Sequence, residues 1–142
     1  MADRTAEVTW KGSGAEGTGT LTSTTSGALG EQQVTWPSRS EEPGGKTSPE
    51  ELIAAAHAGC FSMALAFGLS GGGNPPDELK TSATVTLTPG QGITKIALTV
   101  EGRVPGLDEA AFKEAAEGAK ANCPVSKALA GVSEITLDAK LA

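Results

Sequence analysis

The feature that most constrains the fold is a long, mainly apolar segment from Leu52 to Leu69. The residues before it, Ser48 to Glu51, supply a capping hydroxyl, a proline at the first helical position and a glutamate at the third. These are the marks of a helix start. The run Ser70 to Gly73 then ends the pattern with three glycines. The sequence therefore predicts one long helix through this segment.

The surroundings of this helix follow from its composition. A membrane span is the competing interpretation, but the segment is rich in Ala and Gly, contains His57 and only just reaches the length that a bilayer requires. A helix that is apolar nearly all round is typical of one buried on several sides. We therefore expect a long buried central helix. Its small side chains allow other elements to approach its backbone closely.

The first third of the chain alternates polar and apolar residues as strands do, with Gly-rich turns between. We expect a small antiparallel meander there. The segment Pro37 to Ser48, which contains Arg39, is dominated by Pro, Ser, Gly and charged residues and predicts an irregular loop. The alternating positions are Val8 and Trp10; Thr18, Thr20 and Thr22 around Leu21; and Val34 to Trp36.

The segments after the central helix predict an α+β domain of two layers, in which antiparallel sheets pack against helices. A hairpin, a capped helix, a short helix and a closing strand follow one another. We place them at Thr81–Thr88 and Ile93–Arg103, joined by Pro89 to Gly92; at Glu109 to Ala121, capped by Asp108; at Pro124 to Leu129; and at Glu134 to Leu141.

Length and charge bound the class of protein. The 142 residues suit a single domain spanning 1–142. The net charge of -6 repels phosphate backbones and anionic lipid, so we expect neither a nucleic-acid nor a membrane partner. The segment Met1 to Val8 lacks the apolar core of a signal peptide, which favours a cytoplasmic protein. Because the chain has 19 Gly and only 4% aromatic residues, we also expect a partner chain to complete its core.

Two cysteines, Cys60 and Cys123, are the candidates for chemistry. In a reducing compartment such thiols indicate catalysis, redox sensing or metal binding rather than a structural bridge. Two inert buried thiols are the alternative. Cys123 precedes Pro124, so it can occupy the cap of the short helix, where free N–H groups favour a thiolate. Cys60 lies in mid-helix and needs a cation such as Arg39.

The other candidate motifs are weak. His57 and Cys60 share a helix face, so His57 can be a base for Cys60, although a structural histidine is the favoured interpretation. One histidine and two cysteines are too few for a metal site with recognisable spacing, and we expect no metal. The segment Gly12 to Gly17 matches G-x-G-x-x-G, but a Thr-rich strand follows it where a helix is required. We assign it to a hairpin turn and expect no cofactor.

Two segments, Ser48–Leu65 (SPEELIAAAHAGCFSMAL) and Asn122–Leu129 (NCPVSKAL), resemble the signature regions of the OsmC/Ohr family of osmotically inducible and organic hydroperoxide resistance proteins. The resemblance extends over almost the whole chain, including the closing strand, and is nearer to the OsmC branch. It implies an OsmC-like fold and an intertwined homodimer with two active sites at its interface.

The resemblance also implies a thiol-dependent peroxidase with two cysteines. Cys60 matches the peroxidatic cysteine, which forms a sulfenic acid, and Cys123 the resolving cysteine, which forms a disulfide with it. Arg39 matches a guanidinium that stabilises the thiolate, and Glu50 a carboxylate that holds Arg39 in a bidentate pair. An apolar pocket that includes Phe61 and Met63 suits organic hydroperoxides, with hydrogen peroxide as the second candidate. A dithiol, such as that of a lipoyl protein, is the expected reductant.

Helix geometry adds one inference. At 1.5 Å per residue, ten residues separate Glu50 from Cys60 by roughly 15 Å along one helix. If both belong to one site, Glu50 must come from the other subunit. Two rivals stay open: a homodimer that senses redox state or binds a ligand without turnover, and a structural homodimer with spectator cysteines.

Overall fold

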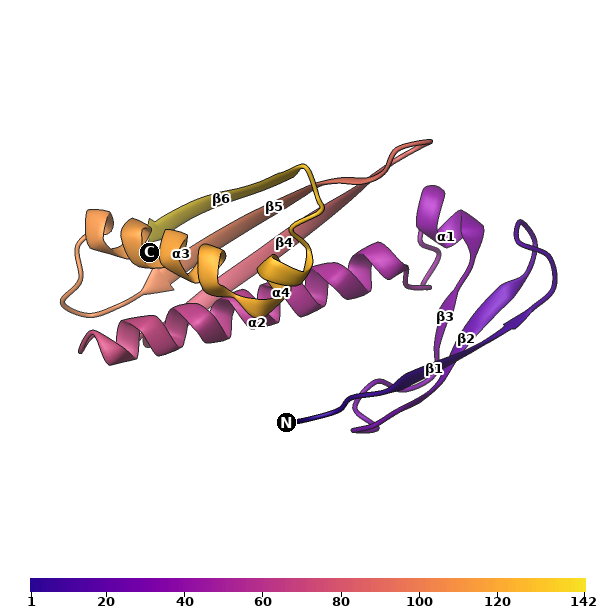
Figure 1. The fold of residues 1–142 in the computed structure, drawn as a ribbon, viewed down its shortest axis with the longest axis horizontal. Helices are drawn as coiled ribbons and strands as arrows, with labels where there is room; N and C mark the ends of the chain where they lie inside the picture. Colours follow the sequence, from indigo (N-terminus) through magenta and orange to yellow (C-terminus); the bar gives the residue numbers. More distant parts are fainter. The chain divides into compact units, whose positions relative to one another are not determined.

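A computed structural model describes all residues, 1–142. The chain forms two compact units, Met1–Leu52 and Ile53–Ala142. Their elements mix strands and helices in the order βββααββααβ, which confirms the α+β class (Figure 1). Helix α2, Pro49–Gly71, is the long helix predicted from the apolar segment, and it ends two residues later than expected.

The first unit contains a three-stranded antiparallel sheet in the order β1-β2-β3, as the alternation predicts. Its strands are β1 (Ala6–Lys11), β2 (Thr18–Thr24) and β3 (Gln32–Val34). The glycine-rich segment between β1 and β2 is a hairpin turn, in which the Gly17 amide donates to the Ser13 carbonyl. The Trp10 indole closes it by donating to the carbonyls of Gly12 and Ser13. This confirms that the glycine motif is a turn.

A short helix, α1 (Trp36–Ser40), replaces part of the loop expected after Pro37. Thr35 and Ser38 form a capping box, in which each side chain accepts from the other's backbone N–H. The Ser38 hydroxyl also donates to the Thr47 carbonyl and ties the helix to the following segment. The expectation of an irregular loop was therefore wrong at this end, because Thr35-x-x-Ser38 is itself a helix start.

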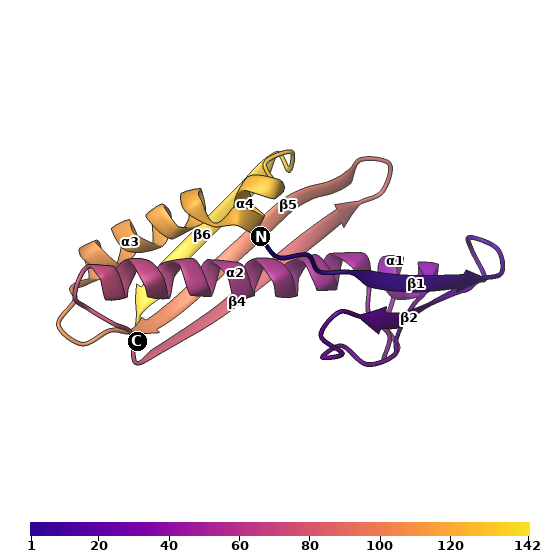
Figure 2. The ribbon, with the colours of Figure 1, turned by 60° about the horizontal axis from the view of Figure 1, so that its bottom comes forward.

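The second unit holds a sheet in the order β4-β5-β6. Strands β4 (Glu78–Thr88) and β5 (Gly92–Arg103) form the predicted antiparallel hairpin. Strand β6 (Glu134–Leu141), however, pairs with β5 in parallel, so the expectation of purely antiparallel sheets was wrong. The reason is the crossover: helix α3 (Glu109–Asn122) and the short α4 (Pro124–Ala128) carry the chain back to the end where β5 begins (Figure 2).

The core of this unit lies between the sheet and its helices. Buried side chains recur every four residues along α2, at Phe61, Leu65 and Leu69. They pack into one cluster with β5 and with Phe112 of α3. Gly102 of β5 leaves room for this ring, since a Cβ there would come within 2.5 Å of Phe112 Cζ. Truncating a fully buried ring costs about 3–5 kcal/mol, so Phe61 and Phe112 anchor the unit.

The opposite face of α2 is exposed in the single chain. Met63 and Phe67 keep 64% and 77% of their surface accessible. The expectation of a helix buried on several sides is therefore met in the single chain only for the face that carries Phe61. By length and composition α2 also suffices to cross a membrane. Because Phe61, Leu65 and Leu69 belong to the core cluster, we interpret α2 as a core helix whose Met63 and Phe67 face is not covered in the single chain.

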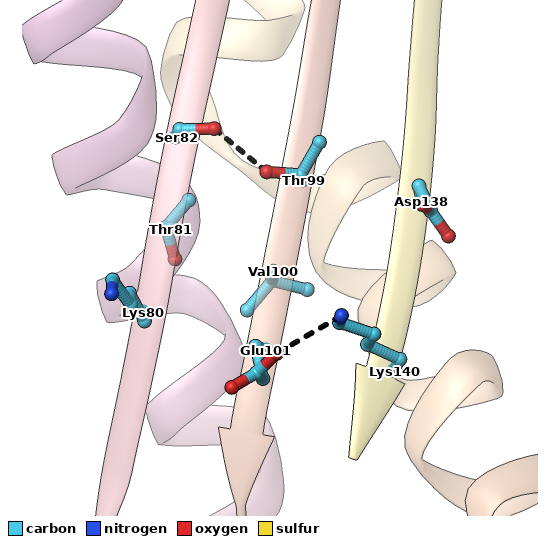
Figure 3. Close-up of a pocket in the computed structure, with 8 residues that line it drawn as sticks. All are labelled: Lys80, Thr81, Ser82, Thr99, Val100, Glu101, Asp138 and Lys140. Carbon is cyan, nitrogen blue, oxygen red and sulfur yellow. Dashed lines mark hydrogen bonds and ion pairs between the residues drawn. The ribbon is translucent and has the colours of Figure 1, made fainter. Parts of the chain in front are cut away.

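The outer face of the second sheet is polar (Figure 3). Lys140 makes an ion pair of 3.1 Å with Glu101 on the neighbouring strand, and Ser82 and Thr99 share a hydrogen bond of 2.7 Å. A shallow hollow of about 430 Å³ lies over these residues. It contains no cysteine, so this face does not compete with Cys60 and Cys123 as a site of thiol chemistry.

Candidate active site

The two cysteines meet in the second unit. Cys60 lies near the middle of α2, and Cys123 lies between α3 and α4, where it ends the first helix and caps the second. Their Sγ atoms are 2.8 Å apart. Both are free thiols, Cys60 partly exposed and Cys123 fully buried. The cap position expected for Cys123 is confirmed, and the two sulfurs lie within bonding reach of one another.

The two thiols differ in acidity. Burial raises the pKa of Cys60 above its ordinary value, and the neighbouring Cys123 sulfur raises it further. Burial alone would also raise the pKa of Cys123, yet its hydrogen bond with Cys60 and the polar groups of Val125 and Ser126 at the start of α4 lower it overall. The negative charge of the pair therefore favours Cys123 within this unit. A thiolate on Cys60 requires an added cation, as the sequence indicated.

His57 is buried one turn before Cys60. Its Nε2 lies 2.7 Å from Ser126 Oγ on α4, and its Nδ1 has no hydrogen-bond partner. Burial lowers the pKa of His57, so the ring is neutral at pH 7. This agrees with the favoured interpretation of a structural histidine. Sequence reasoning missed Ser126, whose only signal was its position three residues after Cys123 in the second signature segment.

An apolar groove of about 540 Å³ opens beside Cys60. Met63 contributes to it as expected, but Phe61 does not, because that ring points into the core. Most of the remaining lining consists of small side chains, which leave the Cys60 sulfur accessible from the groove. The lining residues are Ala55, Ala56, Gly59, Cys60, Met63, Ala64, Phe67 and Pro124.

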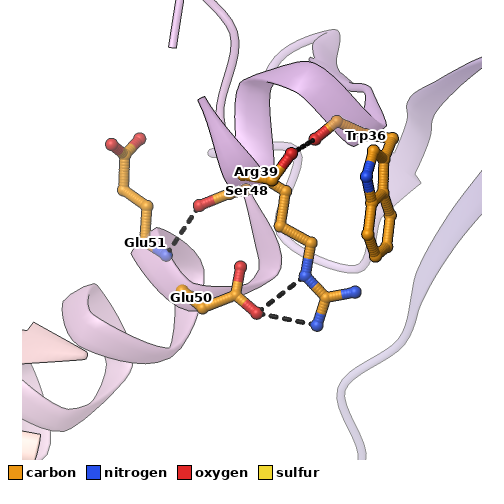
Figure 4. Close-up of polar contacts among 6 residues, drawn as sticks. Trp36, Arg39, Ser48, Glu50 and Glu51 are labelled. Carbon is orange, nitrogen blue, oxygen red and sulfur yellow. Dashed lines mark hydrogen bonds and ion pairs between the residues drawn. The ribbon is translucent and has the colours of Figure 1, made fainter. Parts of the chain in front are cut away.

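Arg39 and Glu50 form a second pair, inside the first unit (Figure 4). The Arg39 Nε donates to Glu50 Oε1 at 2.9 Å, and its Nη2 lies 2.8 Å from the same oxygen. The expected ion pair is thus present, although both donors share one oxygen instead of two. The guanidinium carbon also lies 5.7 Å from the ring centroid of Trp36. The other carboxylate oxygen, Oε2, is buried without a partner.

The four predicted site residues therefore form two pairs, Cys60 with Cys123 and Arg39 with Glu50, each within its own unit. No group of three or more His, Cys, Asp or Glu side chains is placed to hold a metal ion. The cysteine pair can be oxidised to a disulfide, because the two sulfurs are adjacent and Cys60 borders a groove.

Comparison with known proteins settles the family. The family model described as OsmC-like protein matches residues 42–138, a range that holds Glu50 and both cysteines. The chain belongs to the OsmC-like family. Peroxiredoxin OsmC of Escherichia coli (strain K12) is 47% identical over 135 residues, which cover 93% of this chain and 92% of the relative. The organic hydroperoxide resistance protein of Xanthomonas axonopodis pv. citri is 34% identical and covers 66% of this chain and 67% of its own length.

Solved OsmC-like structures have the same fold. The organic hydroperoxide resistance protein from Elizabethkingia anophelis matches with a TM-score of 0.71 and 26% identity, over 97% of this chain and 96% of its own. The organic hydroperoxide resistance protein OhrB of Bacillus subtilis matches with a TM-score of 0.65 and 27% identity, over 97% and 98%. The higher identity to the Escherichia coli relative confirms the predicted OsmC branch.

Proposed function

We propose that this chain is a thiol-dependent peroxidase that reduces organic hydroperoxides with Cys60 and Cys123. The observation that carries the proposal is the 2.8 Å separation of the two sulfurs, with Cys60 bordering an apolar groove. Membership of the OsmC-like family supports it, because relatives in that family are named as a peroxiredoxin and as organic hydroperoxide resistance proteins.

The first step takes place at Cys60, the accessible sulfur of the pair. The Cys60 thiolate attacks one peroxide oxygen and the O–O bond breaks, which leaves a sulfenic acid on Cys60 and an alcohol after protonation of the leaving oxygen. Because the Cys123 pKa is the lower of the pair, the thiolate on Cys60 has to be favoured by a cation that the second unit does not supply. A guanidinium beside Cys60 would favour its thiolate and the developing charge on the leaving oxygen.

The second step joins the two sulfurs. Cys123 attacks the sulfur of the Cys60 sulfenic acid, the S–O bond breaks, and hydroxide leaves. The product is a disulfide, and an external dithiol returns both cysteines to the reduced state by exchange. A lipoyl protein is one dithiol of this class.

A homodimer with shared sites explains what the single chain leaves open. The exposed face of α2, with Met63 and Phe67, and exposed Trp10 and Trp36 in the first unit, call for cover that a partner supplies. In the dimer that we propose, Arg39 and Glu50 of one subunit approach Cys60 of the other. The helix spacing of roughly 15 Å between Glu50 and Cys60 favours this exchange. The single domain expected over 1–142 stays a prediction.

The groove indicates the substrate. Its lining is apolar apart from the Cys60 sulfur, so an alkyl or lipid hydroperoxide gains contacts there that hydrogen peroxide cannot make. Hydrogen peroxide is then the poorer substrate. We place this reaction in the cytoplasm, where dithiol reductants are maintained.

Turnover distinguishes the enzyme from a redox sensor. Purified protein is supplied with excess cumene hydroperoxide and dithiothreitol, and peroxide is followed over time. A peroxidase consumes many equivalents per chain. A sensor oxidises once in the absence of reductant and gives no catalysed consumption above the dithiothreitol background, which would overturn the proposal.

A further inference from the structure

One glycine of helix α2 lies directly beside the accessible sulfur. Gly59 precedes Cys60 in the chain, and both residues line the apolar groove of about 540 Å³. Glycine weakens the middle of a helix relative to alanine, because its backbone loses more freedom on folding and it has no side chain to pack. A glycine at this position of a long helix therefore calls for a reason outside the helix itself.

The usual structural reasons for a glycine do not apply to Gly59. Its φ is not positive, so any L-residue can adopt its backbone conformation. No other element packs against it in the chain: a Cβ built on Gly59 would meet nothing within 4 Å, whereas one on Gly102 would lie 2.5 Å from Phe112 Cζ. The missing side chain of Gly59 instead leaves open space in the groove, which we call the Gly59 notch.

The lining of the groove shows where this notch lies. Apart from Pro124, the lining residues form two rows along one face of α2, with four positions between successive members of a row. Gly59 is the gap in its row, and Cys60 is its neighbour in the other row. Met63 follows one turn later, and its flexible thioether can adapt to what fills the notch. The rows are Ala55, Gly59, Met63 and Phe67, and Ala56, Cys60 and Ala64.

We propose that Gly59 is a specificity-determining residue, whose notch receives the substituents on the carbon that carries the O–O group of an organic hydroperoxide. When the Cys60 thiolate attacks the terminal peroxide oxygen, only two oxygen atoms separate that carbon from the sulfur. A branched or aryl-bearing carbon therefore needs room directly beside Cys60, and hydrogen peroxide does not. The inference rests on the proposed function, because the notch selects among hydroperoxides only if Cys60 reacts with them.

Close approach of a partner subunit is the competing reason for a glycine on this face of α2. Met63 and Phe67, in the same row, are exposed in the single chain, and the proposed dimer covers them. The two reasons predict different results for Gly59→Ala. A methyl group that fills a substrate notch changes the choice of hydroperoxide. A methyl group that separates two subunits weakens their association and slows the reaction of every peroxide alike.

The test compares kcat/KM for cumene hydroperoxide and for hydrogen peroxide, with dithiothreitol as reductant. One methyl group too many in an apolar pocket costs about tenfold or more, so Gly59→Ala should lower kcat/KM by that factor for cumene hydroperoxide and by less than about twofold for hydrogen peroxide. Gly68→Ala is the matched control, because Gly68 also lies in α2 with open space at its Cβ but does not line the groove. It should leave both values unchanged.

Alkylation of Cys60 gives a second readout, which needs no peroxide. N-phenylmaleimide is a bulky reagent and iodoacetamide a small one, and mass spectrometry follows the modification of Cys60 by each. Gly59→Ala should slow the reaction with N-phenylmaleimide about tenfold relative to that with iodoacetamide. Gly68→Ala should keep the ratio of the wild type.

Light scattering completes the comparison, and both variants should keep the oligomeric state of the wild type. An unchanged ratio of the two kcat/KM values in Gly59→Ala would overturn the inference. Loss of the wild-type oligomeric state together with an equal loss of both activities would also overturn it. Failure of the proposed function would appear separately, as a Cys60→Ser chain with undiminished peroxidase activity, whereas the alkylation ratio depends on the Gly59 notch alone.

Discussion

Cys60 and Cys123 are 63 positions apart in the chain, and their sulfur atoms lie 2.8 Å from one another. Three features of the fold bring them together. Helix α2 holds Cys60 directly before buried Phe61, Cys123 caps the end of helix α3, and Pro124 starts α4. The crossover that α3 and α4 form also places β6 beside β5 in parallel orientation. The cysteine pair is therefore a product of the topology of the second unit.

The Arg39–Glu50 pair is expected to assist the oxidation of Cys60. Arg39→Ala should slow that step about 100-fold or more, the order observed when a single donor to a developing oxyanion is removed. Arg39→Lys should recover part of the rate, because it keeps the charge but loses the two donors that share Glu50 Oε1. Single-turnover oxidation by cumene hydroperoxide measures the effect. Equal rates in wild type and Arg39→Ala would exclude Arg39 from the site.

Shared sites make a prediction about mixed dimers. When Cys60→Ser and Glu50→Ala subunits are combined, one of the two sites in each heterodimer regains both wild-type residues. We therefore expect activity to recover well above that of either parent homodimer. Heterodimers isolated with two affinity tags provide the measurement. If they are no more active than the parents, Glu50 acts on Cys60 of its own chain or not at all.

The uncovered face of α2 is expected to hold the dimer together. Phe67→Glu places a charge where 77% of the ring is exposed in the single chain, and its burial in an interface would be costly. The variant should be monomeric by light scattering, whereas Gln91→Glu, in the turn between β4 and β5, should remain dimeric. A Phe67→Glu chain that is as dimeric as the wild type would place the interface elsewhere.

His57 should make stability depend on pH. Its folded pKa is lowered by burial, so below its ordinary value of 6.5 the unfolded chain binds a proton that the folded chain does not. Stability from this group is therefore complete above pH 6.5 and is lost as pH falls below it. Thermal unfolding of wild type and His57→Gln between pH 7.5 and about 5 tests this. We expect the wild type to lose more stability on acidification than the variant; parallel curves would contradict the assignment.

The sequence predicted those parts of the fold that depend on local signals. The start of α2 at Ser48 and Pro49, the β4–β5 hairpin and the Asp108 cap of α3 each require only a few neighbouring residues. The parallel pairing of β6 could not be predicted in this way. It depends on the end of the sheet to which the crossover through α3 and α4 returns the chain. Thr35 and Ser38 mark helix α1, but the Pro, Ser, Gly and charged residues from Pro37 onward predict a loop there.

The candidate site was predictable to a different degree. Neither the spacing of Cys60 and Cys123 nor the composition places them together; the resemblance of two short segments to one family did so. Phe61 was assigned to the pocket because it adjoins Cys60, yet the turn of the helix directs it into the core. Ser126 escaped notice because a serine in a short helix carries no signal until His57, 69 positions earlier, is seen beside it.

The central claim is that Cys60 reacts with peroxide and Cys123 resolves the product. The most direct measurement is mass spectrometry of wild type, Cys60→Ser and Cys123→Ser after one equivalent of cumene hydroperoxide with dimedone present. We predict a Cys60–Cys123 disulfide in the wild type, a dimedone adduct on Cys60 in Cys123→Ser, and no thiol oxidation at a comparable rate in Cys60→Ser. Rapid oxidation of Cys123 in the Cys60→Ser chain, or a wild type without the disulfide, would contradict the account.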